Sequence, residues 1–181
     1  MRAILVLAVL FSSGLHAASI QETCEKSLKQ YFGNDAGLKF SSFPIPPDIK
    51  LSVEQASKQR FFKDKIYYWS ISVNDSTVAL AALDNVMGKA MPISIFVIFD
   101  EEGLILKSEI VKYREAIGGE VVNSRWLKQF IGLNQADLVD PNTRIDGISG
   151  ATISVKAVTK GFKKLSLLFP DIKKHSLDLD N

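Results

Sequence analysis

Residues 151–169 read ATISVKAVTKGFKKLSLLF. An α-helix has about 3.6 residues per turn, so apolar side chains spaced by three or four positions form one stripe along it. Six apolar residues follow this spacing: Ala151, Val155, Val158, Phe162, Leu165 and Phe169. We therefore expect a helix of about five turns, ended by Pro170 because proline cannot keep the backbone hydrogen bonds of a helix. Its apolar stripe must be buried against another layer.

The middle of the chain supplies that layer. Residues 65–73, 77–83, 92–99 and 104–113 are rich in β-branched and aromatic side chains and are separated by short polar turns, such as residues 100–103. Short turns join antiparallel strands. The sequence thus predicts an α+β fold, in which an antiparallel β-sheet packs with a long C-terminal helix and short N-terminal helices.

Weaker patterns fill the remaining segments. An amphipathic helix is expected at residues 23–32, and a second one at residues 52–59 with Ser52 as its N-cap. Between them, the three prolines within residues 43–48 predict a non-helical connector. The order continues with a helix-like stretch at residues 123–131 and a polar loop at residues 132–146.

Residues 1–18 have the layout of a secretory signal peptide, with Arg2 first, then an apolar run and small residues up to Ala18. An uncleaved membrane anchor is the alternative, although the run is shorter than the roughly 20 apolar residues that span a bilayer. We expect an extracytoplasmic, for instance periplasmic, protein, free or membrane-associated. The rest forms one domain, with a lead-in (19–75), a core (76–170) and a polar tail (171–181).

Composition excludes several kinds of site. Cys24 is the one cysteine, so no internal disulfide can form, and a buried thiol is the favoured interpretation. After cleavage His175 would be the remaining histidine, which excludes a His-rich metal site. The net charge of +2 is a small excess of basic residues, so we expect no clustered basic face and no nucleic-acid partner. We predict no metal ligands.

The segment DGISGATIS, residues 146–154, precedes the long helix. Gly147 and Gly150 permit unusual backbone angles, and Ser149 is a good N-cap. The first N–H groups of a helix lack partners within it and favour a phosphate there. Thr152 and Ser154 add hydroxyl groups at this place. An ordinary helix start with an exposed threonine is the alternative.

The stretch DGISGAT resembles the flavinylation motif of the FMN-binding domain family. That family includes the flavin-carrying subunits of sodium-pumping quinone reductase and of the Rnf complex. Two further blocks are similar to family segments and follow the family's order: GKAMPI at 88–93, and YREAIGGEV at 113–121 with RWLKQF at 125–130. The resemblance spans about residues 76–169.

The resemblance implies a covalent cofactor, FMN, joined through a phosphoester to Thr152. Asp146, Gly150 and Ala151 match positions that the family's flavin transferase reads. The loop with Glu115, Gly118, Gly119 and Glu120 is expected near the flavin. Lys89 would face the phosphate or the ring, or else be an exposed lysine at a strand end. Trp126 and Phe130 would cover the ring or, as we favour, pack in the core.

The resemblance also implies a function. We expect an exported FMN-binding flavoprotein that transfers electrons in an extracytoplasmic redox chain, and we favour this role over an oxidoreductase that turns over a substrate. The alternatives are a flavin-dependent reductase acting on a small extracytoplasmic acceptor, and a binding module without redox function. The expected partners are a Mg-dependent transferase that uses FAD, and redox proteins, with a membrane electron-transfer complex as one option.

Overall fold

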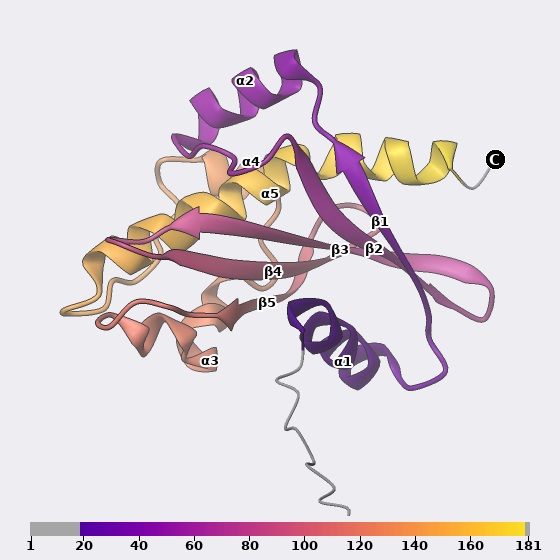
Figure 1. Cartoon of the computed structure of the whole chain (residues 1–181), viewed down its shortest axis with the longest axis horizontal. Coiled ribbons are helices and arrows are strands. Elements are labelled where there is room, and N and C mark those ends of the chain that lie inside the picture. Colours follow the sequence, from indigo (N-terminus) through magenta and orange to yellow (C-terminus); the bar gives the residue numbers. More distant parts are fainter. Residues whose placement is uncertain (1–18, 180–181) are drawn as a thin grey trace, which may run out of the picture.

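A computed structural model describes residues 19–179. Its centre is one five-stranded antiparallel sheet in which neighbouring strands follow the chain, in the order β1-β2-β3-β4-β5 (Figure 1). The strands are β1 (Gly37–Pro44), β2 (Lys65–Val73), β3 (Ser76–Met87), β4 (Pro92–Asp100) and β5 (Ile105–Lys112). With the long C-terminal helix and the short helices, this confirms the predicted α+β fold.

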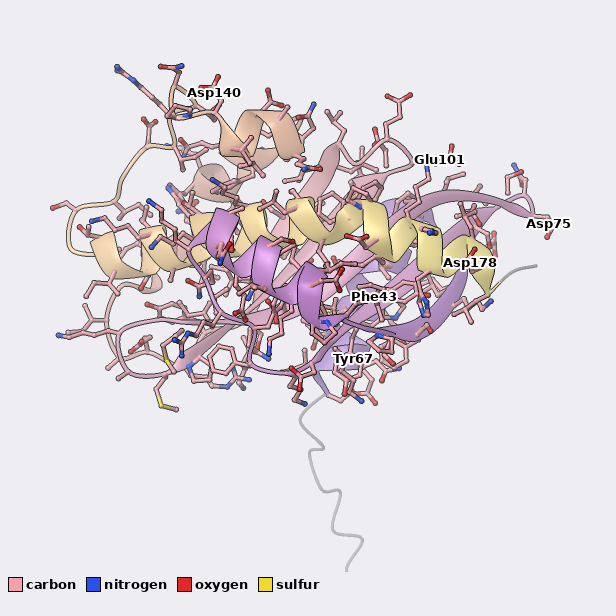
Figure 2. All side chains as sticks on the ribbon, turned by 90° about the horizontal axis from the view of Figure 1, so that it is seen from above. Phe43, Tyr67, Asp75, Glu101, Asp140 and Asp178 are labelled. Carbon is pink, nitrogen blue, oxygen red and sulfur yellow. The ribbon has the colours of Figure 1, made fainter. Side chains whose placement is uncertain are left out.

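Helices cover both faces of the sheet. α1 (Ile20–Phe32) lies on one face, while α2 (Pro47–Ser57) and α5 (Thr152–Asp178) lie side by side on the other (Figures 1 and 2). Alternate side chains of each strand therefore enter two separate cores. Trp69 and Phe96 pack beneath α1 in the smaller core, whereas Tyr68 and Val97 belong to the larger core beneath α5.

The helix α5 confirms the apolar stripe, because all six predicted residues are buried. The predicted end at Pro170 is wrong, since α5 has 27 residues and continues through this proline to Asp178. Contacts beyond Pro170 compensate for the lost hydrogen bond. The Ser176 hydroxyl lies 2.7 Å from that of Ser70, and the His175 ring lies 5.3 Å from the ring of Phe43. Most of the expected polar tail thus continues the helix.

The edge strand β1 was not predicted. It pairs with β2 along its whole length, from Gly37 opposite Ser72 to Pro44 opposite Lys65. Phe43 is its one buried residue. Buried and exposed side chains therefore do not alternate along β1, and such alternation is the pattern that predicts a half-buried strand. Proline is tolerated at the edge of a sheet because no further strand needs its missing N–H group.

Several helix boundaries also differ from the prediction. α2 begins at Pro47, a position where proline's missing N–H is not needed, and the predicted N-cap Ser52 lies inside the helix. Residues 119–130 form short turns rather than one helix: η1 (Gly119–Val122), α3 (Ser124–Leu127) and η2 (Lys128–Phe130). The predicted polar loop contains α4 (Gln135–Val139), which is capped by Asn134.

The signal peptide predicted at residues 1–18 lies outside the described residues. Within residues 19–179, no helix combines the length and the apolar character needed to cross a membrane.

A buried ion pair joins α5 to the sheet. Lys164 Nζ lies 2.6 Å from Asp84 Oδ2 on β3, and Lys164 is fully buried. Burial raises the pKa of Asp84, and the nearby Lys164 opposes this shift. We predict that Asp84→Asn or Lys164→Met lowers the free energy of unfolding by about 3–5 kcal/mol, because each leaves one buried group without its partner. Urea denaturation measures this change.

The double variant Asp84→Leu/Lys164→Met is the control. It removes both charges, so it should recover most of the lost stability. If both single variants were as stable as the unchanged protein, the pair would not hold α5 to the sheet.

Cys24 lies on the side of α1 that packs on the sheet and, as predicted, is buried, with no exposed surface. Burial, with Glu109 and Glu25 nearby, raises the pKa of its thiol to about 12. Only the thiolate reacts with alkylating agents. We therefore predict that iodoacetamide at pH 8 modifies the folded protein at least roughly a thousandfold more slowly than the protein in urea. Mass spectrometry measures the rates, and equal rates would contradict the burial.

Candidate cofactor-binding site

The start of α5 lies at the end of the sheet where β3 turns into β4 (Figure 1). Thr152 is the first residue of the helix and is exposed. The N-cap is Ala151, not the predicted Ser149, and no side chain among the described residues caps this helix end. Gly150 adopts φ +82°, a left-handed conformation that favours glycine. The first N–H groups of α5 are thus available to an anion.

Thr152 lines a shallow pocket of about 270 Å³. Lys89, from the β3–β4 turn, brings a positive charge to it. The other lining residues come from two segments, the helix start and the loop after β5: Ile117, Gly118, Gly150, Ala151, Ile153 and Ser154. The pocket therefore combines a hydroxyl group, a cation and a helix N-terminus, which together suit a phosphate group.

Ser154 connects the helix start to the loop after β5. Its side chain is buried, and its hydroxyl lies 2.9 Å from that of Tyr113. The Tyr113 hydroxyl donates to the carbonyl of Ile117 at 2.6 Å, so it can only accept from Ser154. Gly118, at φ +86°, fits against both hydroxyls, since a Cβ there would lie 2.8 Å from Ser154 Oγ. Ser154 thus positions the loop instead of offering a free hydroxyl.

Glu115 holds the turn that carries Lys89. Its carboxylate accepts hydrogen bonds from the backbone N–H groups of Met91, at 3.0 Å, and Ala90, at 2.7 Å. These bonds, with a smaller contribution from Lys89, lower the pKa of Glu115. A Cβ at Gly88 would overlap the same carboxylate. Glu115 is directed at the turn and thereby places Lys89 beside Thr152.

The loop before Thr152 is held at Asp146 by hydrogen bonds between its backbone and the side chains of Trp126 and Gln129. The indole N–H of Trp126 donates to the carbonyl of Asp146 at 2.7 Å, and Gln129 accepts from the Asp146 N–H at 2.7 Å. The Asp146 carboxylate stays exposed. Trp126 and Phe130 are both buried, with their rings 5.3 Å apart, which is the core-packing role that we favoured.

The structure separates the predicted site residues into groups. The Thr152 pocket contains six of them: Lys89, Gly118, Gly150, Ala151, Thr152 and Ser154. Asp146 and Glu120 line a neighbouring hollow of about 350 Å³. Three predicted residues are exposed but line neither hollow: Gly119, Gly147 and Ser149.

Tyr113 and Gln129 were not predicted as site residues. Both lie within the blocks that resemble the family, but their partners are distant in sequence, Ser154 in one case and Asp146 in the other. The available signal for Tyr113 was a tyrosine hydroxyl, which can both donate and accept a hydrogen bond, at the start of a block that resembles the family. Among residues 19–179 there is no cluster of three His, Cys, Asp or Glu side chains that could hold a metal ion.

These features define a domain built to present an exposed hydroxyl beside an anion-receptive helix start. Residues 88–166 match the family model of the FMN-binding domain, which confirms the suspected family. The chain therefore carries an FMN-binding domain, and this match supports FMN as the cofactor. The match runs from the β3–β4 turn to the middle of α5, and so contains Lys89, Glu115 and Thr152. A search of the curated proteins gives no match.

The role of Glu115 can be tested through hydrogen exchange. We predict that Glu115→Ala raises the exchange rates of the Ala90 and Met91 amides, because it removes their acceptor. Since the pKa of Glu115 is lowered below its ordinary value of 4.5, the protection is fully present above pH 4.5 and is lost as the pH falls through the lowered pKa. Mass spectrometry, corrected for intrinsic rates, measures both effects.

Glu120→Ala is the matched control, because this exposed carboxylate lies on the same loop without reaching the turn. Unchanged protection in Glu115→Ala would show that the turn does not depend on this carboxylate.

Proposed function

We propose that the chain carries FMN covalently, through a phosphoester bond to Thr152, and transfers electrons with it outside the cytoplasm. One observation carries the proposal: Thr152 is exposed at the first position of α5, in a pocket with Lys89, inside a segment that matches the FMN-binding domain. A threonine buried in the core would have made this attachment impossible.

The residues of the site fit such an attachment. The Thr152 hydroxyl is the nucleophile, and a Mg-dependent transferase that uses FAD supplies the flavin. The Thr152 oxygen bonds to the phosphorus next to the flavin, the pyrophosphate bond of FAD breaks, AMP leaves, and the hydroxyl proton is released. The phosphoester keeps one negative charge. The N–H groups at the start of α5 and the Lys89 ammonium stabilise that charge.

Asp146 is suited to the maturation step. Its backbone is fixed by Trp126 and Gln129, while its carboxylate points to solvent. A fixed, exposed carboxylate six residues before the nucleophile is accessible to the active site of a second protein. We propose that it binds the metal ion of the transferase or orients the loop for it.

When bound, FMN supplies one- and two-electron transfer, and the protein tunes and presents it. Among the described residues lining the Thr152 pocket, Lys89 is the one titratable side chain. A reductase needs a proton donor beside its substrate. Because we assign the Lys89 ammonium to the phosphate, no second titratable side chain of this lining is left for that role, and we favour an electron carrier. Turnover of a small acceptor by the flavin-loaded protein would instead favour the reductase.

Export gives the covalent bond a physical reason. A reversible site empties when free cofactor falls below its dissociation constant, and FMN is expected to be scarce outside the cytoplasm. We propose that residues 1–18 direct export and that the phosphoester retains the flavin afterwards.

The attachment is tested by intact-protein mass spectrometry after co-expression with a flavin transferase. The unchanged chain should gain the mass of one FMN less water, whereas Thr152→Ala should gain none because the attacking oxygen is absent. Thr152→Ser keeps that oxygen and should still be modified.

Thr77→Ala is the matched control, since it removes an exposed threonine hydroxyl on β3, outside the DGISGAT stretch. It should be modified like the unchanged chain. A flavin adduct on Thr152→Ala would refute the proposed bond.

A further inference from the structure

A second surface beside the Thr152 pocket combines apolar and basic side chains. Phe62, in the loop between α2 and β2, is 46% exposed, and Met87, at the end of β3, is 48% exposed. Together they border a pocket of about 400 Å³. The other lining residues are Lys58, Gln59, Arg60 and Phe61. We name this pocket and its rim the Phe62 surface.

The loop that carries Phe62 is held rigidly. The Phe61 N–H donates to Glu54 Oε1 at 2.8 Å, and Lys164 Nζ donates to the carbonyl of Arg60 at 2.8 Å. The same ammonium lies 4.4 Å from the centre of the Phe61 ring. The ion pair that joins α5 to the sheet therefore also fixes this loop. An apolar side chain held exposed on a fixed loop is preorganised for binding.

The rim of the Phe62 surface is basic. Lys58 and Arg60 are exposed and line the pocket. Two more exposed cations, Lys63 and Lys65, follow in the chain, with their ammonium groups 5.7 and 5.2 Å from the centre of the Tyr67 ring. The nearby carboxylates are already engaged, because Asp64 pairs with Lys50 at 2.6 Å and Glu54 accepts from the Phe61 N–H. A partner that complements this rim must be acidic.

The Phe62 surface adjoins the cofactor site through the β3–β4 turn. Met87 lines the Phe62 pocket, and Lys89, two residues later, lines the Thr152 pocket. Met91, which ends this turn, is also exposed. A molecule seated on the Phe62 surface would therefore lie next to a flavin on Thr152.

We propose that the Phe62 surface docks the redox partner of this protein, a protein with an acidic surface and an apolar side chain that enters the pocket. The proposal rests on the proposed function, since it assumes a flavin on Thr152. A concave pocket between apolar walls suits a protruding side chain, whereas a lipid headgroup layer presents none. This favours a protein over an anionic membrane.

Stopped-flow electron transfer tests the proposal with the flavin-loaded, reduced protein. The probe is the acidic soluble haem domain of cytochrome b5, and basic cytochrome c is the counter-probe. We expect the rate with the acidic probe to fall with rising salt, and to fall about tenfold or more in Arg60→Glu/Lys63→Glu. Phe62→Ser should also lower it severalfold through the lost apolar contact.

Matched variants on other surfaces provide the controls. Lys26→Glu/Lys128→Glu changes the net charge equally at exposed positions on α1 and η2, and Val139→Ser removes an exposed apolar side chain from α4. These variants should keep at least half of the electron-transfer rate that the unchanged protein shows with the acidic probe. The proposal is overturned if they slow the acidic probe as much as the Phe62-surface variants do, or if Phe62→Ser and Arg60→Glu/Lys63→Glu leave the rate unchanged.

Two further measurements separate the remaining explanations. Sedimentation with phosphatidylglycerol vesicles tests whether the surface binds an anionic membrane. The partner proposal would be overturned if Phe62→Ser abolished binding to the vesicles but left the electron-transfer rate with the acidic probe unchanged. Surface plasmon resonance of the acidic probe on the chain without flavin needs no cofactor. Binding that is lost in Arg60→Glu/Lys63→Glu would support the surface even if Thr152 carried no FMN, so the two proposals can fail separately.

Discussion

Helix α5 can approach β3 and β4 closely because Gly161, near its middle, has no side chain. A Cβ at this position would lie 2.5 Å from Val86 Cγ1 and 2.6 Å from Ile95 Cδ1. Glycine within a helix costs roughly 0.5–1 kcal/mol relative to alanine, and the close contact offsets that cost. Lys164 follows almost one turn later and reaches Asp84 on β3. The two contacts fix how deeply α5 lies on the sheet and which side of it faces the strands.

The position of Thr152 follows from this placement. It precedes Gly161 by nine residues, about 13 Å along the helix axis, which brings the start of α5 to the end of the sheet. The chain after β5 then ties both elements together, because Glu115 binds the β3–β4 turn and Tyr113 meets Ser154. A cofactor on Thr152 would thus rest against a framework made of three distant segments, and not on one mobile loop.

The same ion pair links α5, which begins at Thr152, to the loop of the proposed docking surface. Lys164 contacts Asp84, the Arg60 carbonyl and the Phe61 ring, so one buried ammonium stabilises the α5–sheet contact and the loop that exposes Phe62. A buried charge is strongly destabilising without partners, which explains why this cation is surrounded on all these sides. Stability of the fold and presentation of the surface therefore depend on one group.

Local sequence determined the elements whose signal repeats along the chain: the stripe of α5, the hairpin strands and the DGISGAT segment. It also placed Thr152 at a helix start, because turn glycines and helical periodicity act between near neighbours. Only the tertiary structure decided that Pro170 stays within α5 and that the largely exposed strand β1 pairs at the edge of the sheet. It also decided that Ser154 meets Tyr113 and that Glu115 holds the β3–β4 turn. Each of these depends on contacts between residues far apart in sequence, and periodicity carries no information about such partners.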